Sequence, residues 1–283
     1  MPAARIPNKQ VLKRLRSRPG HGCLGPVFLT ALVLLLRCNA PAVPIGTIVN
    51  PYPFDPGPLP KGSLKGLTVV IDPGHGGEDP GTIQPGVFEA TLTYRTAATL
   101  ARVLRNAGAR THSTVRSSAL TEKGSLKIPR DAAPAVAPNR PLRSAKDNPE
   151  DIYARADLAA RYWDKRVRPL YFVAIHFDSR DPGVRGGHAL WDIPERSGQP
   201  SRLAKNIAVH LGKAGLNGSF PTFPLMQKLG VLSPVRNPLP ERVLVECATL
   251  SDTDDRKAAL DPRWREALCN VLAHAIRDTK KAK

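Results

Sequence analysis

Three polar residues follow short apolar runs of the sequence at the points where those runs end. His75 lies three residues beyond the run 67–72, and His176 and Glu246 are the last residues of the runs YFVAIH and RVLVE. Apolar runs of this length between turn-forming residues are typical of buried strands. In open α/β sheets, ligands bind beyond the carboxyl ends of the strands. We therefore expect the three side chains to meet at one edge of a parallel sheet.

Two imidazoles and a carboxylate suit zinc, which in catalytic sites takes three protein ligands and keeps a fourth position for water. His75 and His176 supply the imidazoles. The third ligand has two candidates. Glu78 forms an H-x-x-E arrangement with His75, and Glu89 lies in the first turn of the next predicted helix, where the helix N-terminus favours its charge. Spacing alone leaves both open. In the competing interpretation, each polar residue only caps a strand or begins a solvated loop.

The other histidines of the predicted strands and helices are expected to have structural roles. His112 and His188 lie within predicted strands and His210 lies on a predicted helix, and nothing in the sequence pairs them with a second ligand. Asp72 ends its strand close to His75, and we expect it to orient a ligand histidine by a hydrogen bond.

Strands and helices alternate between residues 66 and 279. This alternation predicts an α/β fold with a single, mostly parallel, twisted sheet covered by helices on both faces, and it puts the zinc site at the carboxyl ends of the strands. Apolar runs and helical periodicity predict strands at about 67–72, 110–115, 171–176, 188–193 and 242–246, and helices at about 88–107, 151–165, 199–214 and 264–276.

The first 65 residues have the composition of an export signal and a linker. Residues 1–42 combine a basic, acid-free start with the apolar run 24–36 and a small-residue cleavage site, the pattern of a secretory signal peptide. That run is shorter than the roughly 20 residues of a membrane span, and an uncleaved N-terminal anchor is the alternative. Residues 43–65 are proline-rich and are expected to form an extended linker. The protein is thus expected in the periplasm or cell envelope.

The charge of the chain is +18, from 42 lysines and arginines against 24 acidic residues. A strong positive charge concentrates anionic polymers near a protein. For an exported protein, such polymers belong to the cell wall or to lipid surfaces. Neither an RNA-binding aromatic motif nor zinc-finger spacing occurs, so no nucleic-acid partner is expected.

The stretch 117–150 interrupts the alternation of elements with five prolines and no apolar periodicity. A stretch of this length without helices or strands is uncommon inside a domain and is usually either functional or disordered. We expect a surface loop insertion, either a lid or a segment on which a regulatory protein acts.

Four short sequence motifs, which we call blocks, are informative because they occur together in one order. They are IDPGHGGEDPG (71–81), GVFEATLTYRTAATLARVL (86–104), AIHFDS (174–179) and PERVLVECATLSD (240–252). In this order they resemble the zinc-dependent N-acetylmuramoyl-L-alanine amidases of cell-wall turnover. The resemblance covers about residues 66–278, and the residues 66–279 are expected to form the catalytic domain.

The resemblance implies that His75, Glu89 and His176 bind one zinc ion and that Glu246 is the catalytic carboxylate. It also implies hydrolysis of the amide bond between N-acetylmuramic acid and L-alanine, with peptidoglycan as the partner. The family's usual S-I-H-x-N reads A-I-H-F-D here, and its usual E-x-G-F-x-S-N reads E-C-A-T-L-S-D. These departures leave the three expected zinc ligands and the expected catalytic carboxylate unchanged. We expect them to affect substrate preference.

Two other functions stay open on the sequence. A zinc carboxypeptidase-like peptidase would use Glu78 in place of Glu89, and a non-catalytic cell-wall-binding protein would keep the fold without its chemistry. Cys247 and Cys269 are the thiols beyond the signal peptide, and a disulfide between them is conceivable after export. A monomer is expected.

Overall fold

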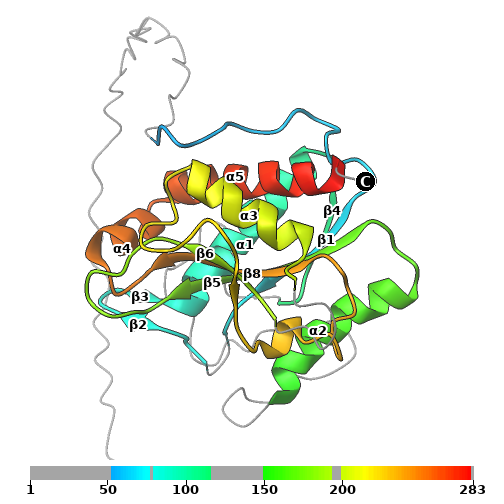
Figure 1. The fold of residues 1–283 in the computed structure, drawn as a ribbon, viewed down its shortest axis with the longest axis horizontal. Coiled ribbons are helices and arrows are strands. Elements are labelled where there is room, and N and C mark those ends of the chain that lie inside the picture. Colours follow the sequence, from blue (N-terminus) through cyan, green and yellow to red (C-terminus); the bar gives the residue numbers. More distant parts are fainter. Residues whose placement is uncertain (1–51, 77–78, 116–148, 193–198, 282–283) are drawn as a thin grey trace, which may run out of the picture. The chain divides into compact units, whose positions relative to one another are not determined.

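The fold is organised around a six-stranded sheet in which the order of the strands in space differs from their order along the chain (Figure 1). The computed structural model describes residues 52–76, 79–115, 149–192 and 199–281. Neighbouring strands follow the order β4-β1-β5-β8-β6-β7. Their bounds are β1 (Thr68–Pro73), β4 (Arg110–Ser113), β5 (Leu170–Asp178), β6 (His188–Trp191), β7 (Leu225–Met226) and β8 (Arg242–Thr249).

Most neighbours in the sheet are parallel, as the alternation of elements predicts. β1 pairs in parallel with β4 and β5, and β5 with β8, whereas β6 runs antiparallel to β8 and carries the short β7. Residues 179–187 between β5 and β6 contain no helix. A parallel crossover needs about a dozen or more residues, so this short connection reverses the direction of the chain. The prediction of a mostly parallel sheet is confirmed.

Helices cover both faces of the sheet, which also confirms the prediction. One face carries α1 (Glu89–Asn106), α3 (Arg202–Lys213) and α5 (Pro262–Lys281), and the other carries α2 (Pro149–Asp164) (Figure 1). The sequence pattern missed α4 (Thr253–Leu260), because Ala259 is its one buried residue and leaves it without an apolar stripe. It also missed the small hairpin of β2 (Ile83–Gln84) and β3 (Val87–Phe88).

Alternating side chains of β5 build the core on the two faces. Tyr171, Val173 and Ile175 belong to the apolar cluster under α1, α3 and α5, and Phe172 and Ala174 belong to the cluster under α2. Side chains along a strand alternate in this way, so a strand buried on both faces reads as a continuous apolar run. The same alternation directs the next polar residue of the strand to the α2 side.

The proline-rich segment ahead of β1 packs more closely than an extended linker would. Residues 52–65 have neither helix nor strand, as predicted, but Leu64 is fully buried and Leu59 is buried beside it in the main core cluster. The Leu64 N–H donates to the carbonyl of Ala107, just beyond α1 (2.8 Å). The folded part therefore begins before Gly66, where the apolar runs alone placed its start.

Several expectations concern parts of the chain outside the described residues. These are the signal peptide 1–42, the first part of the linker 43–65, and residues 117–148 of the insertion 117–150. Within the described part, no helix combines the length and apolar character that a membrane crossing requires.

Candidate metal centre

The predicted site residues lie in one row across neighbouring strands. His176 on β5 is the register partner of Glu246 on β8, and Glu246 is in turn the partner of His188 on β6. Directly paired residues point to the same face of a sheet, so all three side chains lie on the α2 face. Gly74 follows β1, is held to β5 by a backbone hydrogen bond (2.9 Å), and leads into His75.

His176 and Glu246 lie inside their strands, which corrects the prediction that they end them. β5 continues to Asp178 and β8 to Thr249, and these two residues pair after a shift of register. An apolar run ends where the side chains become polar. A strand is held by backbone hydrogen bonds, and these continue past a polar residue. The edge at which the residues meet is nevertheless the predicted one.

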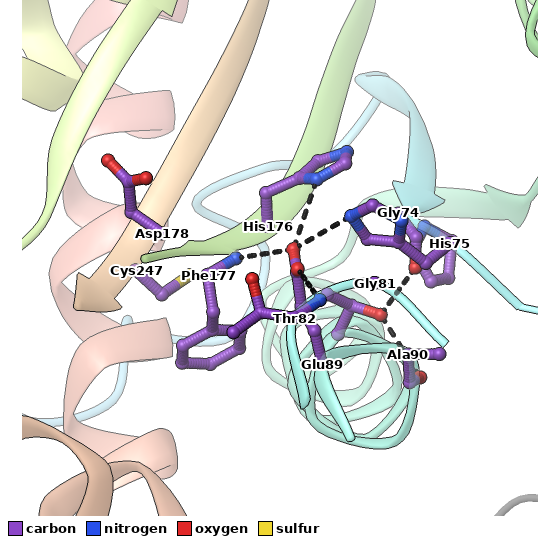
Figure 2. A network of polar contacts seen from close by, with 12 residues as sticks. Gly74, His75, Gly81, Thr82, Glu89, Ala90, His176, Phe177, Asp178 and Cys247 are labelled. Atoms are coloured by element: carbon purple, nitrogen blue, oxygen red, sulfur yellow. Dashed lines mark hydrogen bonds and ion pairs between the residues drawn. The ribbon is translucent and has the colours of Figure 1, made fainter. Parts of the chain in front are cut away.

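The side chains of His75, Glu89 and His176 meet at this edge (Figure 2). Glu89 Oε1 lies 3.0 Å from His75 Nε2 and 3.3 Å from His176 Nδ1. One ligand atom from each residue lies within 4.8 Å of the other two. Zinc bonds of about 2.0–2.2 Å put the ligand atoms of a tetrahedral site roughly 3.3 Å apart. The donor set and its spacing therefore fit a zinc ion.

Glu89 is held by main-chain donors as well as by the two imidazoles. It is the first residue of α1 and is buried. Its Oε1 accepts the Phe177 N–H (3.0 Å) and its Oε2 accepts the Thr82 N–H (2.9 Å). Burial alone would raise the pKa of Glu89, but the hydrogen bonds and charges of His176 and His75 outweigh it and lower the pKa. Glu89 is therefore ionised, as a metal ligand must be.

His75 lies in the loop after β1 with a left-handed backbone (φ 61°). Its Nδ1 is 2.8 Å from Asp79 Oδ2, and Asp79 is fixed in turn by the Gly81 N–H, which donates to its Oδ1 (2.9 Å). Burial lowers the pKa of His75, but the hydrogen bonds and charges of Asp79 and Glu89 outweigh it and raise the pKa to about 10. Two carboxylates around one imidazole create a place that favours positive charge, such as a metal ion.

Asp72 does not contact a ligand histidine, which corrects the prediction for this residue. It accepts hydrogen bonds from the Thr114 hydroxyl and from Arg155 on α2. Arg155 also donates to the carbonyls of Pro73 (2.5 Å) and His75 (2.8 Å). Asp72 points toward α2, so its charge holds the guanidinium that anchors the loop backbone. Asp79 is the carboxylate that orients His75.

Two glycines allow the ligands to come this close. A Cβ on Gly74 would lie 2.2 Å from His176 Cε1, and a Cβ on Gly81 would lie 2.7 Å from Glu89 Oε2. Carbon atoms that do not share a bond sit about 3.5–4.0 Å apart, so a larger residue at either position would displace a ligand.

Glu246 stands next to His176 in the row but outside the three-residue cluster. Its Oε2 is buried and has no hydrogen-bond partner among the described residues. Burial raises the pKa of Glu246 well above its usual range, and the charges of Glu89 and Asp178 raise it further. A carboxyl group whose pKa is raised holds a proton more readily than an ordinary glutamate and can therefore act as a proton donor as well as an acceptor.

A cleft opens beside the cluster. Its polar side is lined by residues of the metal centre together with Arg155, and its apolar side includes Ile152, Leu244 and Val231, the last from the short 3-10 helix η2 (Gly230–Leu232). Sequence reasoning missed Arg155 and this apolar wall, because the loop carbonyl that Arg155 binds lies 80 residues earlier in the chain. Asp79 could have been found from the sequence, because it is an acidic residue near the end of the block IDPGHGGEDPG, which contains His75.

Two of the three histidines that were predicted to be structural agree with that prediction. His112 Nδ1 lies 2.9 Å from the Tyr162 hydroxyl, and His210 Nε2 lies 3.1 Å from Asp278. His188 differs, because within the described part of the chain neither of its ring nitrogens has a hydrogen-bond partner.

Cys247 and Cys269 are both buried and both free thiols, so the conceivable disulfide is not formed. The rival ligand Glu78 lies outside the described residues.

Known proteins share both sequence and fold with this chain. Residues 69–278 match the family described as N-acetylmuramoyl-L-alanine amidase. YrvJ of Bacillus subtilis, an N-acetylmuramoyl-L-alanine amidase by name, is 52% identical over 58 residues, which make up 20% of this chain and 11% of that protein. An uncharacterized cell wall amidase of Bacillus anthracis is 25% identical over 218 residues, or 76% of this chain and 36% of that protein. The matches thus span well under half of either relative.

A solved structure shows the same fold. The CwlD amidase of Clostridioides difficile, in complex with the GerS lipoprotein, has a TM-score of 0.58 at 18% identity, with 76% of this chain and 99% of that chain covered. The family match extends over the sheet, the helices on both faces and the metal centre. On this ground, the chain belongs to the N-acetylmuramoyl-L-alanine amidase family.

Proposed function

We propose that the protein is a zinc-dependent amidase that cleaves the bond between N-acetylmuramic acid and L-alanine in peptidoglycan. The observation that carries the proposal is the meeting of His75, Glu89 and His176 beside Glu246 and an open cleft. The donor set supports the metal, and the family supports the scissile bond.

The three ligand residues would hold a zinc ion with two neutral imidazoles and one carboxylate. When bound, the ion supplies polarisation of the amide carbonyl and activation of a water molecule. Asp79 fixes the orientation and tautomer of His75 through the contact at Nδ1 (2.8 Å). Arg155 secures the same loop from the other side by its bond to the His75 carbonyl (2.8 Å).

Glu246 would move the proton. The nitrogen of an amide leaves poorly as an anion, so it must be protonated as the bond breaks. The raised pKa of Glu246, caused by burial and by the charges of Glu89 and Asp178, suits a group that takes a proton from the attacking water and returns it to that nitrogen.

We also propose that the protein is exported and that residues 117–150 receive a regulatory protein. Export is supported by the signal pattern of residues 1–42 and by a substrate outside the cytoplasm. A protein partner is supported by the CwlD amidase, which was solved with a lipoprotein. Sequencing the N-terminus of the mature protein tests the proposal that the protein is exported. If the insertion blocks the site, deleting residues 120–148 should raise basal activity, and an unchanged or lost rate would contradict that.

Mass analysis of the products from purified peptidoglycan tests the activity. Wild-type protein should release stem peptides that begin with L-alanine, and chelator should stop the release until zinc is restored. Glu246→Gln should keep one zinc ion but lose at least about 100-fold in rate. Glu266→Gln removes a carboxylate that is 47% exposed on α5 and is the matched control. Full cleavage by metal-free protein or by Glu246→Gln would refute the proposal.

The ligand choice has its own test. Glu89→Ala should abolish zinc binding, whereas Glu78→Ala should leave the zinc content unchanged. The reverse result would favour the carboxypeptidase-like ligand set.

A further inference from the structure

The row of side chains across the sheet continues past Glu246 to a histidine that the proposed reaction does not use. His188 on β6 pairs with Glu246 on β8 in antiparallel register. Residues paired in this way have Cβ atoms about 4.5–5.5 Å apart on the same face. The two strands approach closely here, since a Cβ on Gly187 would lie 2.5 Å from the Glu246 carbonyl oxygen. Glu246 thus has an imidazole in the row on either side, His176 on β5 and His188 on β6.

His188 is enclosed by residues that fix the plane of its ring without bonding its nitrogens. It is 2% exposed, and the Phe220 ring stacks on it with centroids 3.9 Å apart and planes at 24°. Its Nε2 lies 3.8 Å from Asp178 Oδ2, which is beyond hydrogen-bond length. That carboxylate oxygen already accepts from Arg180 Nε (2.5 Å).

Both His188 and Glu246 carry buried polar atoms that lack a hydrogen-bond partner among the described residues. Among the described residues, both nitrogens of His188 and Oε2 of Glu246 are buried without a hydrogen-bond partner. Burial lowers the pKa of His188 to about 4, with the Asp178 charge opposing and the Arg180 charge adding to this effect. The ring is therefore neutral, with one N–H donor and one acceptor nitrogen.

Packing alone does not account for a histidine at this position. Buried polar atoms without partners destabilise a fold, so an apolar ring on Phe220 would be the more stable choice. The neighbour with a matching unsatisfied atom is Glu246, the carboxylate to which the reaction is assigned.

We propose that His188 is a positioning residue for Glu246: its N–H donates to the Glu246 carboxylate through one bridging water molecule and holds that group in its working orientation. The proposal rests on the proposed function of Glu246. Loss of a hydrogen bond to a charged group corresponds to a rate decrease of about 10- to 100-fold. Because His188 is enclosed and is not among the residues that line the cleft, the decrease should fall on kcat and leave KM unchanged.

Kinetics of three variants on a soluble muramoyl-peptide, with zinc content and thermal unfolding of the metal-free protein, test the inference. His188→Phe keeps the stacking on Phe220 and removes both nitrogens, so it should lower kcat about 10- to 100-fold with one zinc ion bound and an equal or higher Tm. His188→Gln restores a donor and should recover part of kcat. Trp191→Phe removes a similarly unpartnered nitrogen from the opposite face of β6 and should leave kcat unchanged.

A double variant separates positioning from a general structural role. In the Glu246→Gln background, His188→Phe should lower the residual rate no further. The inference is overturned if His188→Phe keeps the wild-type kcat, or lowers kcat equally in both backgrounds. It is also overturned if this variant lowers Tm by several degrees and raises KM as kcat falls.

If His188→Phe does not fold, the near-isosteric pair His188→Leu and His188→Gln decides, and equal kcat in the two refutes the inference. A wild-type protein that does not cleave the substrate at all would instead refute the proposed function and this inference with it.

Discussion

Replacing Gly74 by alanine should weaken the proposed binding of zinc without unfolding the protein. The added Cβ would lie 2.2 Å from Cε1 of the His176 ring, where ordinary contact begins at 3.4 Å. The ring must therefore withdraw by at least about 1.2 Å. Gly74 does not have a left-handed backbone, so alanine meets no strain other than this contact.

The displacement is large for a metal ligand. Coordination distances tolerate only about 0.2 Å, and the His176 nitrogen already stands 3.3 Å from Glu89 Oε1. We expect zinc affinity to fall at least about 100-fold, which corresponds to about 2.8 kcal/mol. The His176 side chain is 19% exposed toward the cleft, so the ring has room to move and the metal-free fold should keep its stability to within about 1 kcal/mol.

Zinc competition with a chromophoric chelator measures the affinity, and urea denaturation of the metal-free protein measures the stability. Gly66→Ala is the matched control. Gly66 has φ 84° and nothing within 4 Å of an added Cβ, so alanine there should cost about 1–3 kcal/mol in backbone strain and leave zinc affinity unchanged. Wild-type affinity in Gly74→Ala would refute the assignment of His176 as a ligand held against this glycine.

Three further predictions concern the groups that support the site. Asp79→Asn removes the charge beside His75 Nδ1 and should lower zinc affinity about 10- to 100-fold in the same competition assay. Arg155→Met leaves the buried Asp72 without its ion-pair partner (3.0 Å) and should lower the free energy of unfolding by about 3–5 kcal/mol; a loss below 1 kcal/mol in urea denaturation would contradict this. Burial lowers the pKa of His188 to about 4 from its ordinary 6.5, so the unfolded chain binds more protons between these values. Stability should fall as the pH drops from about 6.5 to 4, and His188→Phe should flatten that slope in pH-dependent melting.

The sheet and the place of the site could be predicted because His75, His176 and Glu246 each come at or shortly after the end of an apolar run that is typical of a buried strand. β5 illustrates this, since its side chains alternate between two apolar clusters and no polar residue interrupts it before His176. Spacing alone could not choose between Glu78 and Glu89, because both follow His75 closely enough to reach the same edge. The resemblance to a family favoured Glu89, and the structure places Glu89 against both imidazoles.

Contacts between residues far apart in the chain were beyond this reasoning. Arg155 reaches the loop of His75 only because α2 packs on that side of the sheet. The antiparallel direction of β6 could not be predicted, since a four-residue apolar run has the same pattern in either direction. Without that direction, nothing in the sequence relates His188 to Glu246, and a histidine within a strand is most simply interpreted as structural.

Surroundings, rather than residue types, give the two carboxylates of the site their different roles. Two imidazoles lower the pKa of Glu89 despite its burial, and two main-chain N–H groups hold its carboxylate in place. Among the described residues Glu246 Oε2 has no hydrogen-bond partner; burial raises the pKa of Glu246, and the ionised Glu89 raises it further. Carboxyl groups whose pKa values are pushed apart in this way can divide permanent charge and proton transfer between them. The ionised Glu89 thus also helps to keep Glu246 able to carry a proton, against the opposing charge of His75.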